Sequence, residues 1–319
     1  SAVVPDAQKH LTLYENGQSA NGGFFHNYPA DMVGSWSVTA GGMIHYKPRH
    51  LPIDEQTIVL GTTADVFVVK GRSQDQPVSN LIFDGLAMIG SDHPAGMPGE
   101  IGINHSKWFG SYDGKEWHGE SLGVPGPDLM HGQIFLENAA RIVIRNCKLY
   151  GAGVMAVVLY HWAQENRFEN CWIEDAGDNG IFMMGWEPGR GPFKSVSESY
   201  VNKRNTVTNS VFYDIGRFAS DAGGIYLYFS GDNLIEHNRF LGISRYGVSA
   251  KGWRSMVLNS MFLFGDERKC TNPVSFYDDY VVTPENQGAE LNHSRNNIIR
   301  YNDFSQIART GYDLGAIEM

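Results

Sequence analysis

The chain of 319 residues repeats a short pattern along most of its length. In six places an asparagine directly precedes a small apolar or aromatic cluster that closes an extended run. The six are Asn146, Asn170, Asn209, Asn238, Asn259 and Asn302. Most of these clusters are followed by a turn glycine and a second extended run. An internal repeat of this kind predicts a stack of similar coils, in which residues far apart in sequence lie above one another.

The extended runs have the composition of β-strands. They are short, rich in β-branched and aromatic residues, and bounded by Gly, Asn and Asp. The regular region carries no sustained helical period. Because equivalent strands recur after each full turn of the chain, we expect them to pair in parallel and in register. The repeat thus predicts an all-β solenoid.

The organisation along the chain is predicted from changes in this pattern. Residues 1–60 contain extended pieces without a clear period, and we expect them to form a strand-rich N-terminal cap over the first coil. Residues 61–319 are expected to form the coils, with long loops at 92–130, 186–204 and 264–295. The sequence stops at GAIEM, within an expected strand, so we expect the C-terminus to be truncated.

Composition narrows the classes of function. The formal net charge of −10 argues against binding to nucleic acid or to an anionic membrane surface. The chain begins at Ser1 and shows no signal peptide, which we interpret as a processed protein, secreted or periplasmic. Cys147 and Cys171 are expected to stack as buried neighbours, and no Cys/His spacing matches a zinc site.

Three aspartates beside turn glycines are candidates for acid chemistry: Asp178, Asp221 and Asp313. Counted by the asparagines, Asp178 and Asp221 fall in consecutive coils, where stacked strands lie about 4.8 Å apart. Two carboxylates at about 5 Å push their pKa values apart and match the pair of a retaining glycosidase. If one of the two aspartates lay at a different corner of its coil, the two carboxylates would be further apart, at the distance found in inverting glycosidases. The alternative is ordinary Asp-Gly turn chemistry, which weighs most for Asp313.

Aromatic and polar residues in the neighbouring runs are candidates for binding sugars, because they offer ring faces together with hydrogen-bond donors and acceptors. The set of expected substrate-binding residues is Tyr226, Tyr228, His161, Lys251, Asp313, Glu318 and Trp108. Taken singly, such residues are more often surface decoration or local packing. Glu174 and Asp175 crowd Asp178 and are weaker catalytic candidates.

Several segments resemble a known group of carbohydrate-active proteins. They include GGMIHYKPR, VFVVKG, PVSNLIFDGLAM, SDAGGIYLYFSGDNLIEHNRF and TGYDLGAIEM, of which DAGGIY and DLGAIE are the most specific. Together they are similar to right-handed parallel β-helix proteins around glycoside hydrolase family 141, a group with α-L-fucosidase and xylanase activities. The resemblance implies a pectin-lyase-like fold and catalytic acids at Asp221 first and Asp178 second. The fold class predicted is therefore an all-β right-handed parallel β-helix (solenoid) with an N-terminal strand-rich cap.

The expected function is hydrolysis of a complex poly- or oligosaccharide by the Asp178 and Asp221 pair, with no cofactor and no metal. One alternative is a polysaccharide lyase of the same fold, which would need a base such as Lys251 and Ca²⁺ or basic side chains to neutralise a uronate. Another is a glycan-binding protein whose aspartates only form turns. The expected partner is a carbohydrate substrate, without nucleic acid or membrane.

Overall fold

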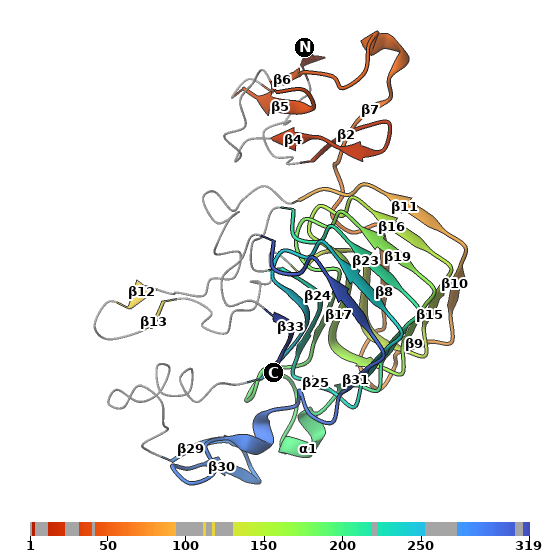
Figure 1. Ribbon diagram of the computed structural model, residues 1–319. Helices are drawn as coiled ribbons and strands as arrows, with labels where there is room; N and C mark the ends of the chain where they lie inside the picture. Colours follow the sequence, from red (N-terminus) through yellow and green to blue (C-terminus); the bar gives the residue numbers. More distant parts are fainter. Residues whose placement is uncertain are drawn as a thin grey trace.

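The structure is a computed structural model, and it describes residues 2–3, 12–22, 32–39, 42–93, 111–112, 117–118, 130–217, 222–252, 273–309 and 315–319. Three parallel sheets dominate it (Figure 1). The largest contains ten strands: β8 (Phe67–Lys70), β9 (Val78–Ser79), β14 (Gly132–Ala140), β17 (Met155–Gln164), β20 (Ile181–Met184), β21 (Asn202–Lys203), β24 (Gly223–Tyr228), β25 (Ser230–Gly231), β28 (Tyr246–Lys251) and β33 (Gly315–Glu318).

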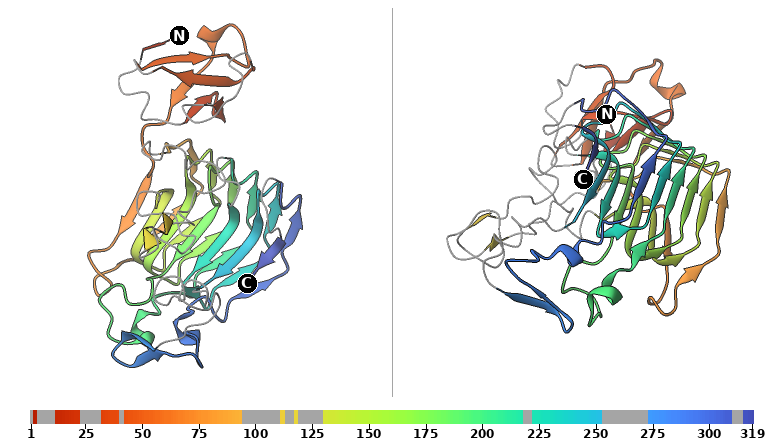
Figure 2. Two further views of the ribbon diagram at one scale, coloured as in Figure 1. Left: turned by 90° about the vertical axis from the view of Figure 1, so that its left-hand side faces the viewer. Right: turned by 60° about the horizontal axis from the view of Figure 1, so that its bottom comes forward.

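Two further parallel sheets have six strands each. The first contains β10 (Ile82–Asp84), β15 (Val143–Arg145), β18 (Arg167–Glu169), β22 (Thr206–Thr208), β26 (Leu234–Glu236) and β31 (Ile298–Arg300). The second contains β11 (Ala87–Ile89), β16 (Lys148–Tyr150), β19 (Trp172–Glu174), β23 (Val211–Tyr213), β27 (Arg239–Leu241) and β32 (Asp303–Ser305). Within each six-stranded sheet the strands follow one another in sequence order, which Figure 2 shows as a progression from orange to blue.

The remaining described elements are small. The N-terminal strands form a four-stranded sheet and a three-stranded sheet: β1 (Ala2–Val3), β4 (Asn21–Gly22), β5 (Ser35–Val38) and β6 (Met43–Tyr46), then β2 (Leu13–Glu15), β3 (Gln18–Ser19) and β7 (Ile58–Leu60). The other elements in the described residues are two antiparallel hairpins, a short helix and two 3₁₀ turns: β12 (Ser111–Tyr112) with β13 (Trp117–His118), β29 (Val274–Tyr277) with β30 (Tyr280–Val282), α1 (Val196–Ser199), Ile53–Glu55 and Ala289–Leu291. No helix in these described ranges is long and apolar enough to cross a membrane.

The bend between the two six-stranded sheets explains part of the asparagine repeat. Asn146, Asn170 and Asn209 have φ angles of 54°, 53° and 51°. Such left-handed backbone is unusual for residues other than glycine, and asparagine tolerates it better than most. His237 and Tyr301 occupy the same position in the next two bends and also have positive φ.

The other described repeat asparagines stand one position later. Asn238 and Asn302 lie in register with Cys147, Cys171 and Ser210, whose side chains turn inward. Asn238 accepts a hydrogen bond from the backbone N–H of Ser210 at 3.0 Å, and Asn302 accepts one from that of Asn238 at 2.9 Å. Cys147 and Cys171 are buried neighbours with free thiols, as expected. The five repeat asparagines that the structure describes therefore mark two adjacent positions.

A second asparagine ladder, not recognised in the sequence, lines the bend that follows the ten-stranded sheet. Asn166 Nδ2 donates to Asn205 Oδ1 at 3.0 Å, and the backbone N–H of Asn205 donates to Asn233 Oδ1 at 2.9 Å. Asn233 Nδ2 in turn donates to Asn297 Oδ1 at 2.9 Å. These side chains supply hydrogen bonds to buried backbone groups that the bend takes out of the strand ladders.

The core lies between the three sheets and consists of rows of identical or similar side chains. Phe212, Phe240 and Phe304 stack on successive strands, with ring centroids 4.8 Å and 4.9 Å apart. This spacing equals the distance between neighbouring strands, about 4.8 Å. Leu159 of the ten-stranded sheet and Ile144 of the first six-stranded sheet belong to the same buried cluster. Parallel register thus converts a sequence repeat into continuous apolar rows.

The predicted fold class, an all-β right-handed parallel β-helix with an N-terminal strand-rich cap, is wrong as stated. The structure is all-β with mostly parallel sheets of six to ten strands side by side and a single helix, α1, and no closed barrel is found among the described strands. The repeat predicts parallel pairing, because equivalent strands recur. It carries no information on how the sheets meet or on what covers their first strands.

The first strands are not covered in the way a cap requires. Val68, Ile82 and Ile89 on these strands are 57%, 61% and 59% exposed. Among the described residues, the N-terminal strands pair only with one another. The predicted domain boundary at residue 60 stays a prediction.

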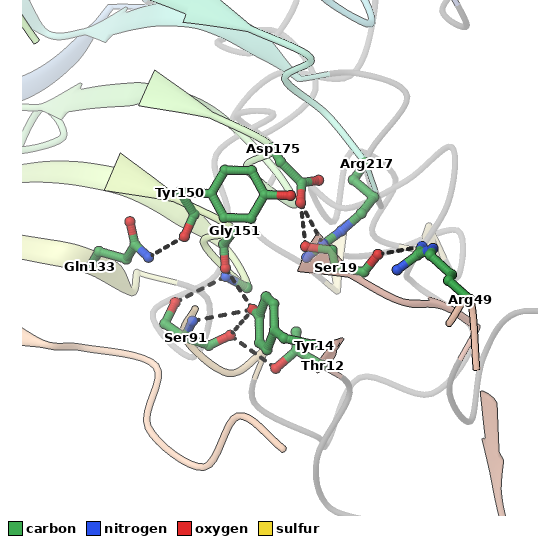
Figure 3. A network of polar contacts seen from close by, with 11 residues as sticks. Thr12, Tyr14, Ser19, Arg49, Ser91, Gln133, Tyr150, Gly151, Asp175 and Arg217 are labelled. Carbon is green, nitrogen blue, oxygen red and sulfur yellow. Dashed lines mark hydrogen bonds and ion pairs between the residues drawn. The ribbon is translucent and has the colours of Figure 1, made fainter. Parts of the chain in front are cut away.

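The N-terminal sheets instead contact the bends at one end of the parallel strands (Figure 3). The Tyr14 hydroxyl lies 2.7 Å from the Ser91 carbonyl oxygen and 2.6 Å from that of Gly151. The Ser19 hydroxyl donates to Asp175, whose Oδ2 also lies 3.1 Å from Arg217 NH1. A buried ion pair thus joins two bends to strand β3.

We expect Asn205→Asp to destabilise the protein strongly. It places a carboxylate at a fully buried position and replaces the amide that donates to the Ala163 carbonyl at 3.2 Å. An unpaired buried charge costs about 3 kcal/mol or more. Urea unfolding measures the loss. The matched change Asn170→Asp, at an exposed bend, should cost less than about 1 kcal/mol; equal losses would contradict the role of the inner ladder.

Asp175→Asn should also lower the free energy of unfolding, by about 3 kcal/mol, because it removes the carboxylate that neutralises the buried Arg217 guanidinium. The reference is Asp214→Asn, which disrupts an ion pair with Arg309 that is about half exposed and so should cost less than about 1 kcal/mol. Thermal unfolding followed by circular dichroism separates the two. Similar melting temperatures for both variants would show that the Asp175 pair does not anchor the N-terminal sheets.

Candidate functional site

The outer face of the ten-stranded sheet, turned away from the central core, carries most of the candidate binding residues. One row in register contains Val158, Phe182, Tyr226, Ser249 and Glu318. A second row contains Tyr160, Met184, Tyr228 and Lys251. The rows run across β17, β20, β24, β28 and β33, so Val158 and Glu318, 160 positions apart in sequence, belong to one row.

Lys251 and Glu318 form the charged centre of this face. Lys251 Nζ lies 2.7 Å from Glu318 Oε2, and the Ser249 hydroxyl donates to the same oxygen at 2.7 Å. The Lys251 ammonium also lies 5.4 Å from the ring centroid of Tyr226 and 5.1 Å from that of Tyr246. These distances suit cation–π attraction. The structure therefore brings together Lys251, Glu318 and Tyr226, three of the expected substrate-binding residues.

Tyr246 and Arg245 belong to this cluster but were missed in the sequence. The Arg245 guanidinium lies 4.7 Å from the Tyr246 ring centroid. Strict alternation from Ser249 would turn Tyr246 inward. However, Val248 lies in the central core and a Cβ on Gly247 would sit 2.4 Å from the core residue Phe304, so two successive residues face inward. This irregularity returns Tyr246 to the outer face.

The electrostatics of the cluster fix the protonation of its acid and its phenol. Burial alone would raise the pKa of Glu318, but the hydrogen bonds and charge of Lys251, with Ser249 and Tyr246, hold that pKa below its usual value. Burial and the nearby Glu318 charge raise the pKa of Tyr246 to about 12. At neutral pH Glu318 is therefore a carboxylate acceptor, and Tyr246 keeps its hydroxyl proton.

Asp178 lies at the bend that leads into β20. It is 4% exposed, and its backbone N–H donates to the Val154 carbonyl at 2.8 Å. The next residue, Asn179, accepts a hydrogen bond from the backbone N–H of Gly223 at 2.7 Å. Since Ile181 pairs with Ile225, the same register brings Asp178 level with Ala222, the residue after Asp221 in the sequence.

Several predicted site residues lie outside the described residues: Asp221, Asp313 and Trp108, together with the repeat marker Asn259. Their predicted roles stay predictions. The predicted distance of about 5 Å between the carboxylates of Asp178 and Asp221 likewise remains a prediction.

Tyr226 and Tyr228 are buried within an aromatic and methionine-rich cluster on the outer face. Their ring centroids lie 6.1 Å apart with the planes inclined by 12°. Two glycines, Gly223 and Gly224, precede them. A Cβ on Gly223 would sit 2.4 Å from the Tyr226 ring, and one on Gly224 would sit 2.5 Å from Phe240. These glycines make room for the protein's own aromatic rings.

His161 lies at the other end of the sheet. It follows Tyr160, which is level with Met184, whereas Asp178 precedes β20. At about 3.3 Å per residue the two are separated by on the order of 20 Å along the strands. His161 Nδ1 lies 3.2 Å from Glu137 Oε1, and its ring stacks on Trp186 with centroids 3.4 Å apart. Burial lowers the pKa of His161.

The weaker catalytic candidates lie in the contact with the N-terminal sheets. Asp175 forms the ion pair with Arg217, and Glu174 accepts a hydrogen bond from Trp172 Nε1 at 2.5 Å. Both residues line a cavity of about 470 Å³ beside β3. Within the described part of the chain, no group of three or more His, Cys, Asp or Glu side chains is arranged to hold a metal ion.

Comparison with known proteins supports the fold. No protein-family model and no curated protein sequence matches the chain. A solved structure titled "Glycoside hydrolase" is similar, with a TM-score of 0.52 and 18% sequence identity. The similarity covers 70% of this chain and 40% of that chain, so this chain spans well under half of the similar protein's length. The two proteins share a fold.

Replacing Glu318 should give a pH-dependent loss of stability. The lowered pKa of folded Glu318 means that its ion pair stabilises the protein above the usual value of 4.5, and that this contribution is lost as pH falls through the folded pKa. Glu318→Gln should therefore lower the free energy of unfolding by about 2 kcal/mol at pH 7. Urea unfolding at several pH values should show the difference from wild type shrinking below pH 4.5.

The control for this prediction is Glu165→Gln, which removes a carboxylate from an exposed pair with Arg141. It should change stability by less than about 0.5 kcal/mol at any pH. A Glu318→Gln loss that stays constant down to pH 3 (roughly one to two units below an ordinary carboxyl pKa) would show that the effect is not ionic.

Proposed function

We propose that the protein is a glycoside hydrolase acting on a poly- or oligosaccharide, with its site on the outer face of the ten-stranded sheet. The observation that carries the proposal is the cluster of Lys251, Glu318, Tyr226 and Tyr246 on one sheet face, on a fold shared with a solved glycoside hydrolase. Such a face offers charged donors and acceptors for sugar hydroxyls beside aromatic rings.

The chemistry proposed for this site needs two carboxyl groups. One protonates the glycosidic oxygen, and the other either attacks the anomeric carbon or activates a water molecule. We assign these roles to Asp178 and Asp221, without deciding which is the acid. Asp178 suits such a role because it is held at a bend by backbone hydrogen bonds and lies at the same end of β20 as the adjoining 222–223 bend.

The side chains of the Lys251 and Glu318 cluster have binding roles in this proposal. Glu318 is an ionised acceptor for sugar hydroxyls, and Lys251 is a donor that stays beside it as its counter-ion. Tyr226 and Tyr228 form the aromatic floor beneath them. Asp313 and Trp108 remain proposed substrate-binding residues from the sequence alone.

A lyase mechanism fits this cluster less well. A lyase would use Lys251 as a neutral base to remove the proton next to a uronate carboxyl group. Here the Lys251 ammonium neutralises Glu318 at 2.7 Å, so its positive charge is already offset and does not serve to neutralise a uronate carboxylate.

Asp178→Asn tests the proposal directly. Removing an acid or base that transfers a proton should lower kcat/KM by about 10²–10⁴-fold. The measurement is the release of reducing sugar and of aryl leaving groups from a panel of plant polysaccharides and aryl glycosides. Asp303→Asn, an exposed aspartate beside Arg239, should keep wild-type activity. Full activity of Asp178→Asn would overturn its catalytic role.

The same panel separates the rival functions. Products that absorb ultraviolet light as unsaturated uronides would identify a lyase and sink the hydrolase proposal. If the wild-type protein binds a polysaccharide of the panel but cleaves no compound in the panel, the protein is a glycan-binding protein.

A further inference from the structure

A second pocket lies beside α1, at the end of the ten-stranded sheet opposite the N-terminal sheets (Figure 1). Its volume is about 540 Å³. Its lining includes the side chains of Gln74, Trp162, Gln164, Phe193, Tyr200 and Lys203. They come from the turn after β8, the end of β17 and the continuous stretch that contains α1 and β21, so the pocket is assembled from three separate parts of the chain.

Aromatic side chains form one wall of this pocket. Trp162 is partly exposed there, and Phe193 meets the edge of Trp186 with ring centroids 6.3 Å apart. Trp186 stacks in turn on His161. The contacts with Trp186 hold the Phe193 ring in place before a ligand binds. Binding therefore costs little side-chain conformational entropy at Phe193. His161, proposed from the sequence to bind substrate, does not line the pocket itself but stacks on Trp186 behind it.

The polar lining suits an uncharged ligand. Gln74 and Gln164 carry amide groups that both donate and accept hydrogen bonds. The charges balance, since Lys194 and Lys203 face the pocket together with Asp75 and Glu198. An aromatic face combined with amide donors and acceptors matches the two sides of a sugar ring, which has apolar C–H groups on its faces and hydroxyls at its edge.

We propose that this α1 pocket binds a neutral sugar unit of a polysaccharide chain. The pocket lies on the order of 20 Å along the strands from Asp178. The proposal rests on the proposed function. A sugar chain that reaches from the α1 pocket to Asp178 must contain several sugar units, so the substrate is a polysaccharide and not a disaccharide.

Binding is tested first without catalysis. Isothermal titration calorimetry with the full chain carrying Asp178→Asn uses linear β-1,4-linked hexasaccharides of xylose, glucose and mannose as probes. At least one should bind, and adding Trp162→Ala should weaken it by about tenfold or more, the usual effect of removing a central tryptophan. Trp162→Tyr should keep most of the affinity, since it retains a ring.

The matched control is Trp172→Ala. Trp172 is 43% exposed on β19, outside the pocket, so its removal should leave the affinity unchanged. Circular dichroism confirms that each variant is folded, and Gln164→Ala provides a second pocket variant with an intact ring. Binding of no hexasaccharide, or equal binding by the Trp162→Ala and control proteins, overturns the proposal.

Kinetics distinguish a failure here from a failure of the proposed function. In a catalytically competent background, Trp162→Ala should raise KM for the bound hexasaccharide several-fold and leave hydrolysis of a short aryl glycoside unchanged. Weakened hexasaccharide binding with no hydrolysis of any substrate would support the pocket and reject the hydrolase. Hydrolysis that is unaffected by Trp162→Ala for both lengths would support the hydrolase and reject the pocket.

Discussion

The structure depends on parallel, in-register backbone pairing between equivalent strands of the three sheets. Because each strand repeats the one before it, every side chain lies about one strand spacing from its counterpart. On the inner side this gives the stack of Phe212, Phe240 and Phe304. On the outer side it places Tyr226, Ser249 and Glu318 in one row. The same pairing that builds the core therefore assembles the candidate site.

The sequence predicted this pairing but not its details, and the asparagines show why. Asparagine tolerates the left-handed bend of Asn146 and also suits the inward, hydrogen-bonding position of Asn238. One letter thus marks two adjacent positions, and counting by asparagines carries an error of one residue. The predicted position of the N-terminal strands, over the first coil, was wrong for another reason. These strands contact the bends through the side chains of Tyr14 and Ser19, and single side-chain contacts of this kind produce no periodic pattern in the sequence.

The candidate site shows the same division between what alternation predicts and what it misses. Lys251 and Tyr226 could be placed on one face because alternation holds over residues 225–228 and 248–251. Tyr246 could not, since Gly247 and Val248 both turn inward. His161 was placed on the correct strand, but a single sequence gives no measure of position along a long strand. Its separation from Asp178 follows only from the register of β17 and β20.

The two buried ion pairs differ in what they hold together. The Asp175–Arg217 pair joins separate bends to the N-terminal strand β3, where backbone pairing between these parts is absent among the described residues. The Lys251–Glu318 pair lies on β28 and β33, which their own ladder already holds in register. Burying charges costs several kcal/mol, about as much as the pair returns. The pair therefore adds little net stability beyond that ladder, and in the proposed function Lys251 and Glu318 bind a polar ligand.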